Sequence, residues 1–151
     1  MLNPDQFEQF ARQGFTRVPL VREVYSDLDT PLSVYLKLAT GAYTYLFESV
    51  EGGSRWARHS IIGLPASRVL KVYGNRLEIE QDGVVIVSRE VADPLQEIQL
   101  IKASYRVPKL DDLPRFFGGW VGYFGYDCAR YVEPQLAPAL GRDELGMPDI
   151  C

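Results

Sequence analysis

The sequence predicts an α+β fold, with antiparallel β-sheets packed as a sandwich and helices on the outside. Closely spaced strand-like runs, joined by tight-turn dipeptides, predict the antiparallel sheets. Helical segments that begin with a capping residue and proline flank those runs and predict the outer helices. The nine Tyr and seven Phe of this 151-residue chain favour strands, and its length suffices for one domain with a core of its own.

Three predicted helices share one start signal, a polar capping residue followed by proline at the first helical position. Gly14 ends the first helix, Gly41 ends the second and Val107-Pro108 ends the third. In the third helix Gln96 can close a capping box. The three starts are Asn3-Pro4-Asp5, Thr30-Pro31 and Asp93-Pro94.

Three segments in the first half of the chain have the composition of strands. Tyr43 to Val50 is an apolar and aromatic run with one Glu-Ser pair, which predicts a central strand buried on both faces. After a glycine pair, Trp56 to Gly63 is predicted to return as a strand. Val18 to Tyr25 also reads as a strand, but Pro19 restricts it to an edge or irregular position.

A meander of three strands is predicted next. Gly74-Asn75 and Asp82-Gly83 separate its strand-like runs, and Asp-Gly between two such runs is a strong hairpin signal. The strands are expected over Arg68 to Tyr73, Arg76 to Glu80 and Val84 to Arg89.

The stretch from Phe116 to Asp127 alternates aromatic residues with glycine. It lacks the Gly-Lys-Ser or Gly-Lys-Thr of a phosphate-binding loop, so it predicts no nucleotide site. Glycine among aromatic residues is typical of a strand that another backbone approaches closely. We therefore expect such a strand here, passing into a helix near Tyr126 to Val132.

Charge and residue counts exclude several classes of function. The net charge of -4 does not favour nucleic-acid binding, which needs a basic face. No apolar run approaches the roughly 18 residues of a membrane span and no signal peptide is evident, so a cytoplasmic protein without a membrane partner is expected. With one histidine, His59, and two cysteines, Cys128 and Cys151, the chain has neither a metal-ligand pattern nor a disulfide framework, and no catalytic residue is predicted.

Glu48 and Ser49 are the candidate ligand-binding residues because they stand where the apolar run ends. A carboxylate at Glu48 can neutralise an ammonium group, and Ser49 with nearby backbone amides can bind a carboxylate. Leu46, Phe47 and Val50 can line an apolar pocket beside them. These groups together meet the requirements of a bulky free amino acid.

A second interpretation gives the polar pair a structural role. Glu48 can pair with Arg55 or Arg58 across the turn, and Ser49 can bond to its own backbone as a turn former. Adjacent residues of a regular strand also point to opposite faces. Glu48 and Ser49 can therefore both aim side chains at one ligand only if the strand bulges or ends there.

Two strings around this turn resemble elements of anthranilate synthase large subunits. Leu46-Phe47-Glu48-Ser49 is similar to the family's leucine-leucine-glutamate-serine element, and Arg58 to Gly63 is similar to its arginine-tyrosine-serine-x-isoleucine-glycine element. In that family the serine belongs to the tryptophan feedback site, and Ser49 matches it. Phe47 and His59 depart from the pattern but keep size and apolar character.

Two further segments extend the resemblance, which runs from about Phe15 to Asp149. Thr30 to Leu38 resembles the threonine-proline-x-serine-x-tyrosine segment of anthranilate synthases. Gly118 to Asp127 resembles the glycine-rich element shared by anthranilate, aminodeoxychorismate and isochorismate synthases, which all use chorismate.

The resemblance implies that residues 1–151 form the N-terminal regulatory domain of anthranilate synthase component I, and that the C-terminal chorismate-binding catalytic domain is absent from this chain. The whole enzyme would be a lyase of tryptophan biosynthesis that converts chorismate and ammonia to anthranilate and pyruvate with magnesium. The magnesium ligands would lie outside this piece, which alone is expected to be inactive.

The resemblance also implies partners and a regulatory site. The partners would be the catalytic domain of the same chain and a glutamine amidotransferase subunit, component II, that supplies ammonia. L-tryptophan would be the feedback inhibitor, with Ser49 and Glu48 as contacts and Arg58 as a further candidate.

Two other functions stay open at this point. An aminodeoxychorismate synthase would share much of the pattern, and its homologous pocket would hold tryptophan as a fixed structural element. A stand-alone amino-acid-binding module would need no catalytic domain.

Overall fold

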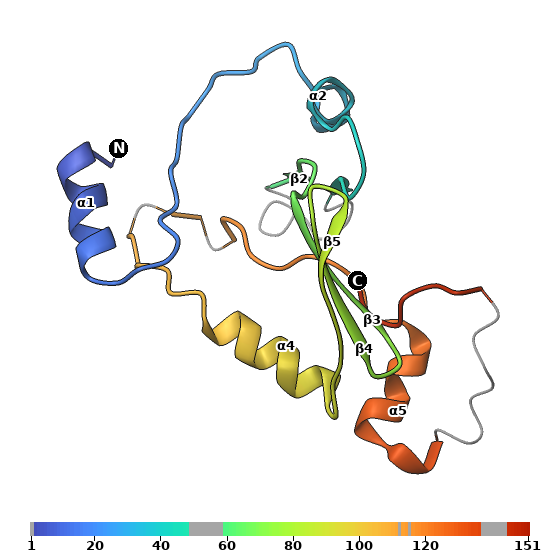
Figure 1. Ribbon diagram of the computed structural model, residues 1–151. Coiled ribbons are helices and arrows are strands. Elements are labelled where there is room, and N and C mark those ends of the chain that lie inside the picture. The colour runs from blue at the N-terminus through green and yellow to red at the C-terminus, as the bar shows by residue number, and fades with distance from the viewer. Residues whose placement is uncertain (1, 49–58, 112, 115, 137–144) are drawn as a thin grey trace. The chain divides into compact units, whose positions relative to one another are not determined.

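The computed structural model describes residues 2–48, 59–111, 113–114, 116–136 and 145–151. Its helices and antiparallel strands confirm the α+β class (Figure 1), while the packing of the sheets as a sandwich stays a prediction. The helices are α1 (Pro4–Arg12), α2 (Pro31–Leu38), α4 (Pro94–Ala103) and α5 (Ala129–Val132), and the strands are β1 (Tyr45–Phe47), β2 (Ile61–Gly63), β3 (Arg68–Tyr73), β4 (Arg76–Gln81) and β5 (Val84–Glu90).

The chain divides into two compact units. The first holds Met1–Glu23, Leu70–Ile79 and Val87–Cys151, and the second holds Val24–Val69 and Glu80–Ile86. In the second unit Gly63 is the one buried residue among those described. Among the described residues, the buried hydrophobic side chains of the core all belong to the first unit, and they are Leu70, Val72, Leu77, Ile79, Val91 and Ile150.

All three predicted helix starts are confirmed. Asn3 and Thr30 begin α1 and α2 with capping boxes, in which side chain and backbone bond reciprocally. The Asp93 side chain begins α4 by accepting a hydrogen bond from the Gln96 backbone N–H at 3.0 Å. Each cap satisfies a helical N–H that has no partner inside the helix, so the local sequence determines where these helices begin.

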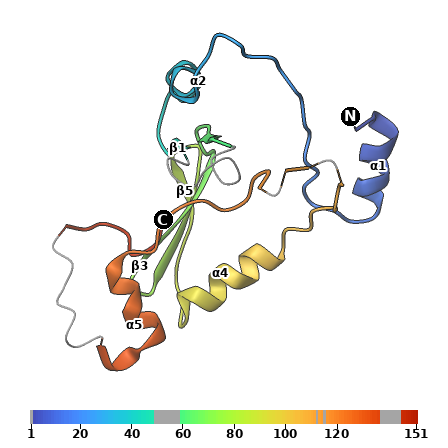
Figure 2. The ribbon, with the colours of Figure 1, turned by 180° about the vertical axis from the view of Figure 1, so that it is seen from behind.

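The predicted meander is confirmed as a sheet of three strands in the order β3-β4-β5. Asp82 (φ 52°) and Gly83 (φ 81°) both adopt positive φ at the second turn, as a type I′ hairpin requires. Along β4, Leu77 and Ile79 are buried and Glu78 between them is less so, which places one face of the strand on the core. Apolar residues of α4 pack against this core, namely Leu95, Ile98 and Ile101. Figures 1 and 2 show α4 following β5 along the chain.

The last residues of the chain lie between β3 and the glycine-rich stretch. Ile150 forms antiparallel bridges to Val72 on one side and to Phe124 on the other. A Cβ built on Gly122 would stand 2.0 Å from the Cys151 carbonyl oxygen, so glycine is required for this approach. The predicted close backbone packing is therefore confirmed, as is the helical segment that follows, which consists of a 3₁₀ turn (Tyr126–Cys128) and α5. The strand predicted for this stretch is wrong, because its described residues form only an isolated bridge at Phe124.

We expect Gly122→Ala to be more destabilising than Gly125→Ala. The alanine Cβ at position 122 would collide with backbone, which cannot rotate away, whereas at position 125 it would stand 3.1 Å from the Asp149 carbonyl oxygen. Overpacking of this kind costs about 1–3 kcal/mol. Thermal unfolding of the two variants measures the difference, and equal melting temperatures would contradict the backbone contact.

Two further strand predictions are wrong. Residues 18–25 form no strand, because Pro19 lacks an N–H and no described strand pairs with the segment. Tyr43 to Val50 is not a central strand buried on both faces, since β1 covers only Tyr45–Phe47 and pairs with β2 alone. Gly41 (φ 124°) and Tyr43 (φ 58°) hold the backbone outside the β region, which delays the start of β1.

Candidate functional site

The candidate site lies at the end of β1, which α2 precedes in the second unit. Asp29, just before α2, accepts hydrogen bonds from Lys37 at 2.5 Å and from Ser33 at 2.8 Å. These bonds, the one from Lys37 first, hold the pKa of the Asp29 carboxyl below its usual value. Within α2, the Tyr35 hydroxyl lies 2.9 Å from the hydroxyl of Thr44, which directly precedes β1, and this contact ties the helix to the start of the strand.

β1 and β2 form the platform from which the candidate site extends. They are antiparallel, with Tyr45 opposite Gly63 and Phe47 opposite Ile61. A Cβ on Gly63 would stand 2.0 Å from the Tyr45 ring, so the ring lies directly over this glycine. The Phe47 ring lies next along the same face, 4.8 Å from the Tyr45 ring between centroids.

Of the six predicted site residues, Leu46, Phe47 and Glu48 fall within the described residues. Leu46 is half-buried, and Phe47 is 53% exposed. Because β1 is a regular strand, the side chains of these two adjacent residues lie on opposite faces. Leu46 and Phe47 therefore do not line the same face of β1. Glu48 follows the strand directly, is exposed, and makes no ion pair with a described residue.

The other predicted site residues lie outside the described residues. They are Ser49, Val50 and Arg58, and Arg55 of the alternative ion pair lies there too. The predicted tryptophan contacts therefore stay predictions, and so does the competing ion pair across the turn. What the structure adds is that β1 ends at Phe47, so Glu48 already stands outside the regular strand. Glu48 and Ser49 can both aim side chains at one ligand only if the strand bulges or ends there, and β1 does end before Glu48.

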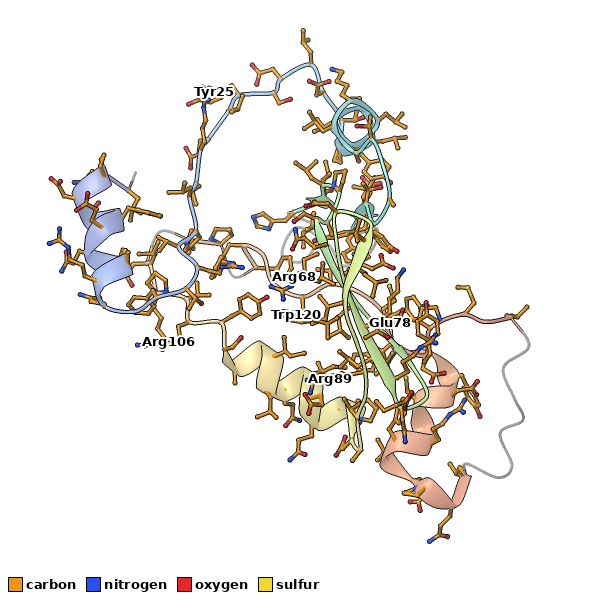
Figure 3. All side chains as sticks on the ribbon, in the orientation of Figure 1. Tyr25, Arg68, Glu78, Arg89, Arg106 and Trp120 are labelled. Atoms are coloured by element: carbon orange, nitrogen blue, oxygen red, sulfur yellow. The ribbon has the colours of Figure 1, made fainter. Side chains whose placement is uncertain are left out.

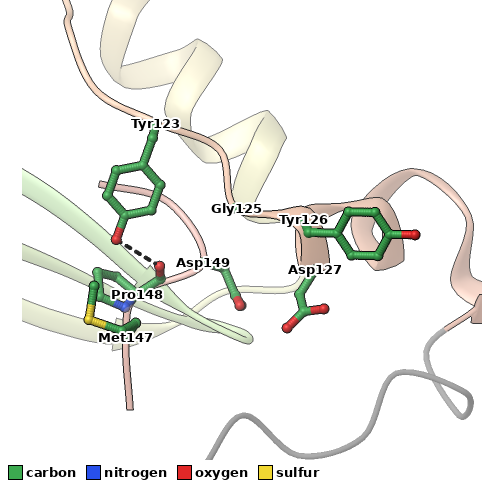
Figure 4. A pocket seen from close by; sticks show the side chains of 7 residues that line it. All are labelled: Tyr123, Gly125, Tyr126, Asp127, Met147, Pro148 and Asp149. Atoms are coloured by element: carbon green, nitrogen blue, oxygen red, sulfur yellow. Dashed lines mark hydrogen bonds between the residues drawn. The ribbon is translucent and has the colours of Figure 1, made fainter. Parts of the chain in front are cut away.

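A second concave feature lies in the first unit (Figure 4). The pocket measures about 220 Å³, and in it the Tyr123 hydroxyl donates to the Pro148 carbonyl oxygen at 3.1 Å. Burial raises the pKa of the Tyr123 phenol. The two carboxylates that line the pocket already have partners. Asp127 forms an ion pair with Arg130 at 3.2 Å, and Asp149 accepts a hydrogen bond from the Gly74 backbone N–H. The lining residues are Tyr123, Gly125, Tyr126, Asp127, Met147, Pro148 and Asp149.

Asp149 is the centre of a buried polar cluster that was not predicted from the sequence. Its side chain accepts hydrogen bonds from the Gly74 backbone N–H at 2.8 Å and from the Tyr131 hydroxyl at 2.5 Å. The Tyr131 hydroxyl also lies 2.8 Å from the Gly74 carbonyl oxygen, and Arg130 stands 3.7 Å from the carboxylate. The cluster joins α5, the turn between β3 and β4, and the end of the chain.

The same cluster predicts how stability responds to alkaline pH. Burial, and next the bond to Asp149, raises the pKa of the Tyr131 phenol, while Arg130 opposes the shift and Cys128 adds to it. The folded chain therefore keeps this proton above a pH of about 10, where the unfolded chain loses it, and the free energy of unfolding falls as pH rises through that range.

We expect Tyr131→Phe to make this alkaline loss of stability shallower, at a cost of about 1 kcal/mol at neutral pH from the lost hydrogen bonds. Urea unfolding between pH 8 and 11 measures both effects, with ~0.5 pH-unit steps being sufficient because a single group titrates over about two units. Tyr126→Phe, at an 89% exposed side chain, is the control. Equal slopes for the two variants would contradict the assigned role of Tyr131.

Neither a metal cluster nor a membrane helix appears in the part of the chain that the structure describes. No group of three or more His, Cys, Asp or Glu side chains is arranged there to hold a metal ion. No helix there is long and apolar enough to cross a membrane.

Comparison with known proteins shows which proteins this chain resembles. Anthranilate synthase component 1 of Pseudomonas aeruginosa is 52% identical over 149 residues, which cover 99% of this chain and 30% of that protein. This chain is a homologue of the amino-terminal portion of anthranilate synthase component 1. Component 1 of Pseudomonas putida is 49% identical with the same coverage, and that of Acinetobacter calcoaceticus is 44% identical over 153 residues, 99% of this chain and 31% of that protein.

The chain thus spans about a third of the length of these component 1 proteins. No protein-family model matches it. The comparison confirms the resemblance that the motifs around β1 and the glycine-rich stretch indicated. It says which protein the chain resembles and leaves the roles of individual residues untested.

Proposed function

We propose that the chain is the amino-terminal part of an anthranilate synthase large subunit and contributes to its tryptophan feedback site. The proposal is carried by the 52% identity to such a subunit over nearly all of the chain. The whole enzyme would convert chorismate and ammonia to anthranilate and pyruvate, as a lyase in the cytoplasm. Component II, a glutamine amidotransferase, would supply the ammonia.

The exposed apolar side chains of the second unit support a partner within the same polypeptide. Leu36 and Leu38 of α2 and Phe47 of β1 are all more than half exposed. Burial of such side chains against a partner would contribute up to about 1.5–3 kcal/mol each. We assign this surface to contact with the catalytic domain of the full-length protein.

Tryptophan would bind at the end of β1. Glu48, exposed just beyond the strand, would accept the ligand's ammonium group. Ser49 would contact the ligand, with Arg58 available to its carboxylate. Phe47 and Val50 would supply apolar contacts to the indole ring. The Leu46 side chain leaves the opposite face of β1 and would not contact the same ring, so Leu46 is withdrawn from the predicted lining.

Feedback inhibition needs more than occupancy of this site. Tryptophan lowers activity only if it binds an inactive arrangement of the two domains more tightly than the active one. A site on this chain that is completed by the catalytic domain meets that requirement, because domain movement changes the site. Magnesium would serve the chorismate reaction, and its ligands would belong to the catalytic domain.

Growth of bacterial mutants tests the proposed reaction. The full-length gene should restore growth without tryptophan to a strain that lacks the large subunit. It should not relieve a requirement for p-aminobenzoate, as an aminodeoxychorismate synthase would. The segment 1–151 alone should restore neither. A native polypeptide no larger than this chain, detected in the source cell with an antibody, would favour the stand-alone binding module instead.

We expect Glu48→Gln in the full-length enzyme to weaken tryptophan inhibition. Loss of the charged partner of an ammonium group costs about 1–2 kcal/mol at an exposed site, or roughly a five- to thirtyfold higher tryptophan concentration for half-inhibition. Inhibition curves at fixed chorismate measure it, with Glu23→Gln, an exposed glutamate far along the chain, as the control. Superimposable curves for wild type and Glu48→Gln would remove Glu48 from the site.

A further inference from the structure

Near its end, the glycine-rich stretch forms an isolated antiparallel bridge from Phe124 to Ile150, and no described residue occupies the other side of this bridge. The Tyr123 N–H donates to the Cys151 carbonyl oxygen at 2.7 Å, and the Gly125 N–H donates to the Asp149 carbonyl oxygen at 2.7 Å. In an antiparallel ladder alternate residues bond to alternate sides. The N–H and C=O of Phe124 therefore point to the other side, where neither group bonds to any described residue.

This edge lacks the usual protection against pairing. Proteins guard exposed edge strands with charged residues, proline or bulges. The run from Phe116 to Tyr126 contains no charged residue and no proline. Phe124 is 64% exposed, and Trp120, labelled in Figure 3, is also exposed.

The opposite edge of the three-stranded sheet carries such protection at the end of β5, whereas Val84, Val85 and Ile86 at the start of β5 are exposed apolar residues. β5 ends in Ser88-Arg89-Glu90, which places charged side chains along that edge. Arg89 pairs with Glu97 of α4 at 2.5 Å (Figure 3). The contrast marks the edge at Phe124 as a surface for another strand.

We propose that the free side of residues 122–125, next to the bridge at Phe124, pairs with an extended, mainly apolar strand from the remaining polypeptide of the large subunit. This inference rests on the proposed function, because the occupant is chosen from the length of the relatives. In those proteins the same stretch is covalently attached to more than twice its own length of additional chain, since it makes up 30% of the whole. A strand in the same polypeptide reaches the edge at high effective concentration, which a separate molecule does not.

The test uses the full-length gene product with p-benzoylphenylalanine, a photoreactive amino acid, in place of Phe124. Equal amounts of isotopically light and heavy protein are mixed before irradiation, so that mass spectrometry separates cross-links within one polypeptide from those between two. Position 9, on the exposed face of α1, carries the same reagent as the control.

The proposal expects position 124, and not position 9, to cross-link within one polypeptide to a single segment outside residues 1–151. Cross-links between light and heavy chains would make the occupant a second copy and overturn the proposal. So would cross-links confined to residues 1–151, or none.

Amide hydrogen exchange of the unsubstituted, monomeric full-length protein covers the case in which the substitution prevents folding. The Phe124 amide should exchange at least about a hundredfold more slowly than in an unstructured peptide. Exchange at the unstructured rate would overturn the proposal. Assays of anthranilate formation on the same preparation distinguish this inference from the proposed function. An active enzyme in which the Phe124 amide is unprotected would refute only this inference. An inactive protein in which that amide is protected would refute only the proposed function.

Discussion

Ser49→Phe in the full-length enzyme should relieve tryptophan inhibition and leave chorismate turnover nearly intact. Ser49 matches the serine of the family's feedback element and follows β1 by two residues. A phenylalanine there would occupy space that the ligand needs and would remove a hydroxyl. Overpacking of about 2 kcal/mol corresponds to roughly a thirtyfold higher tryptophan concentration for half-inhibition.

The measurement is a set of inhibition curves for anthranilate formation at one chorismate concentration. Ser67→Phe is a matched control, because Ser67 is exposed in the loop before β3 and belongs to the same unit. Relief in Ser49→Phe alone would place the serine at the ligand. Unchanged inhibition in that variant would remove Ser49 from the site, and a parallel loss of turnover would point to a folding defect.

Asp149→Ala should be strongly destabilising. The carboxylate is 8% exposed and accepts hydrogen bonds from the Gly74 N–H and the Tyr131 hydroxyl, with Arg130 nearby. Its removal leaves the partly buried Gly74 N–H and Tyr131 hydroxyl without this acceptor and takes from Arg130 the more buried of its two carboxylate partners, which together costs about 3 kcal/mol. For a domain of this size that loss lowers the melting temperature by about 6–12 °C.

Asp127→Ala is the matched control for this prediction. Asp127 pairs with the same arginine at 3.2 Å, but its side chain is 36% exposed. Solvent screens such a pair, so its loss should cost less than about 1 kcal/mol. Thermal unfolding of both variants in the full-length protein checks the order, and similar melting temperatures would show that the Asp149 cluster contributes little.

The elements that the sequence predicted correctly are those with local causes. Thr30 lies beside the N–H group that it caps, and Asp82-Gly83 supplies the two positive φ values that its own turn requires. The failures depended on a missing partner strand or on backbone conformations that the residue types do not specify. Residues 18–25 are strand-like in composition but have no described strand to pair with, and β1 is short because of the backbone at Gly41 and Tyr43.

The polar cluster around Asp149 shows why part of the chemistry was missed. Asp149 and Gly74 are 75 residues apart in the chain, so no local pattern links them. The one available signal is an aspartate between Pro148 and Ile150, where a polar residue interrupts apolar neighbours. The candidate site at the end of β1 is predicted by resemblance to family motifs. Periodicity alone does not decide whether Glu48 and Ser49 contact a ligand or form the turn.

The most direct test of the account is the product formed by the purified full-length protein from chorismate, ammonium and magnesium. We predict anthranilate, recognised by its fluorescence and its mass, and we predict that added L-tryptophan suppresses its formation. Aminodeoxychorismate as the product, or no turnover of chorismate in protein that is folded, would contradict the account.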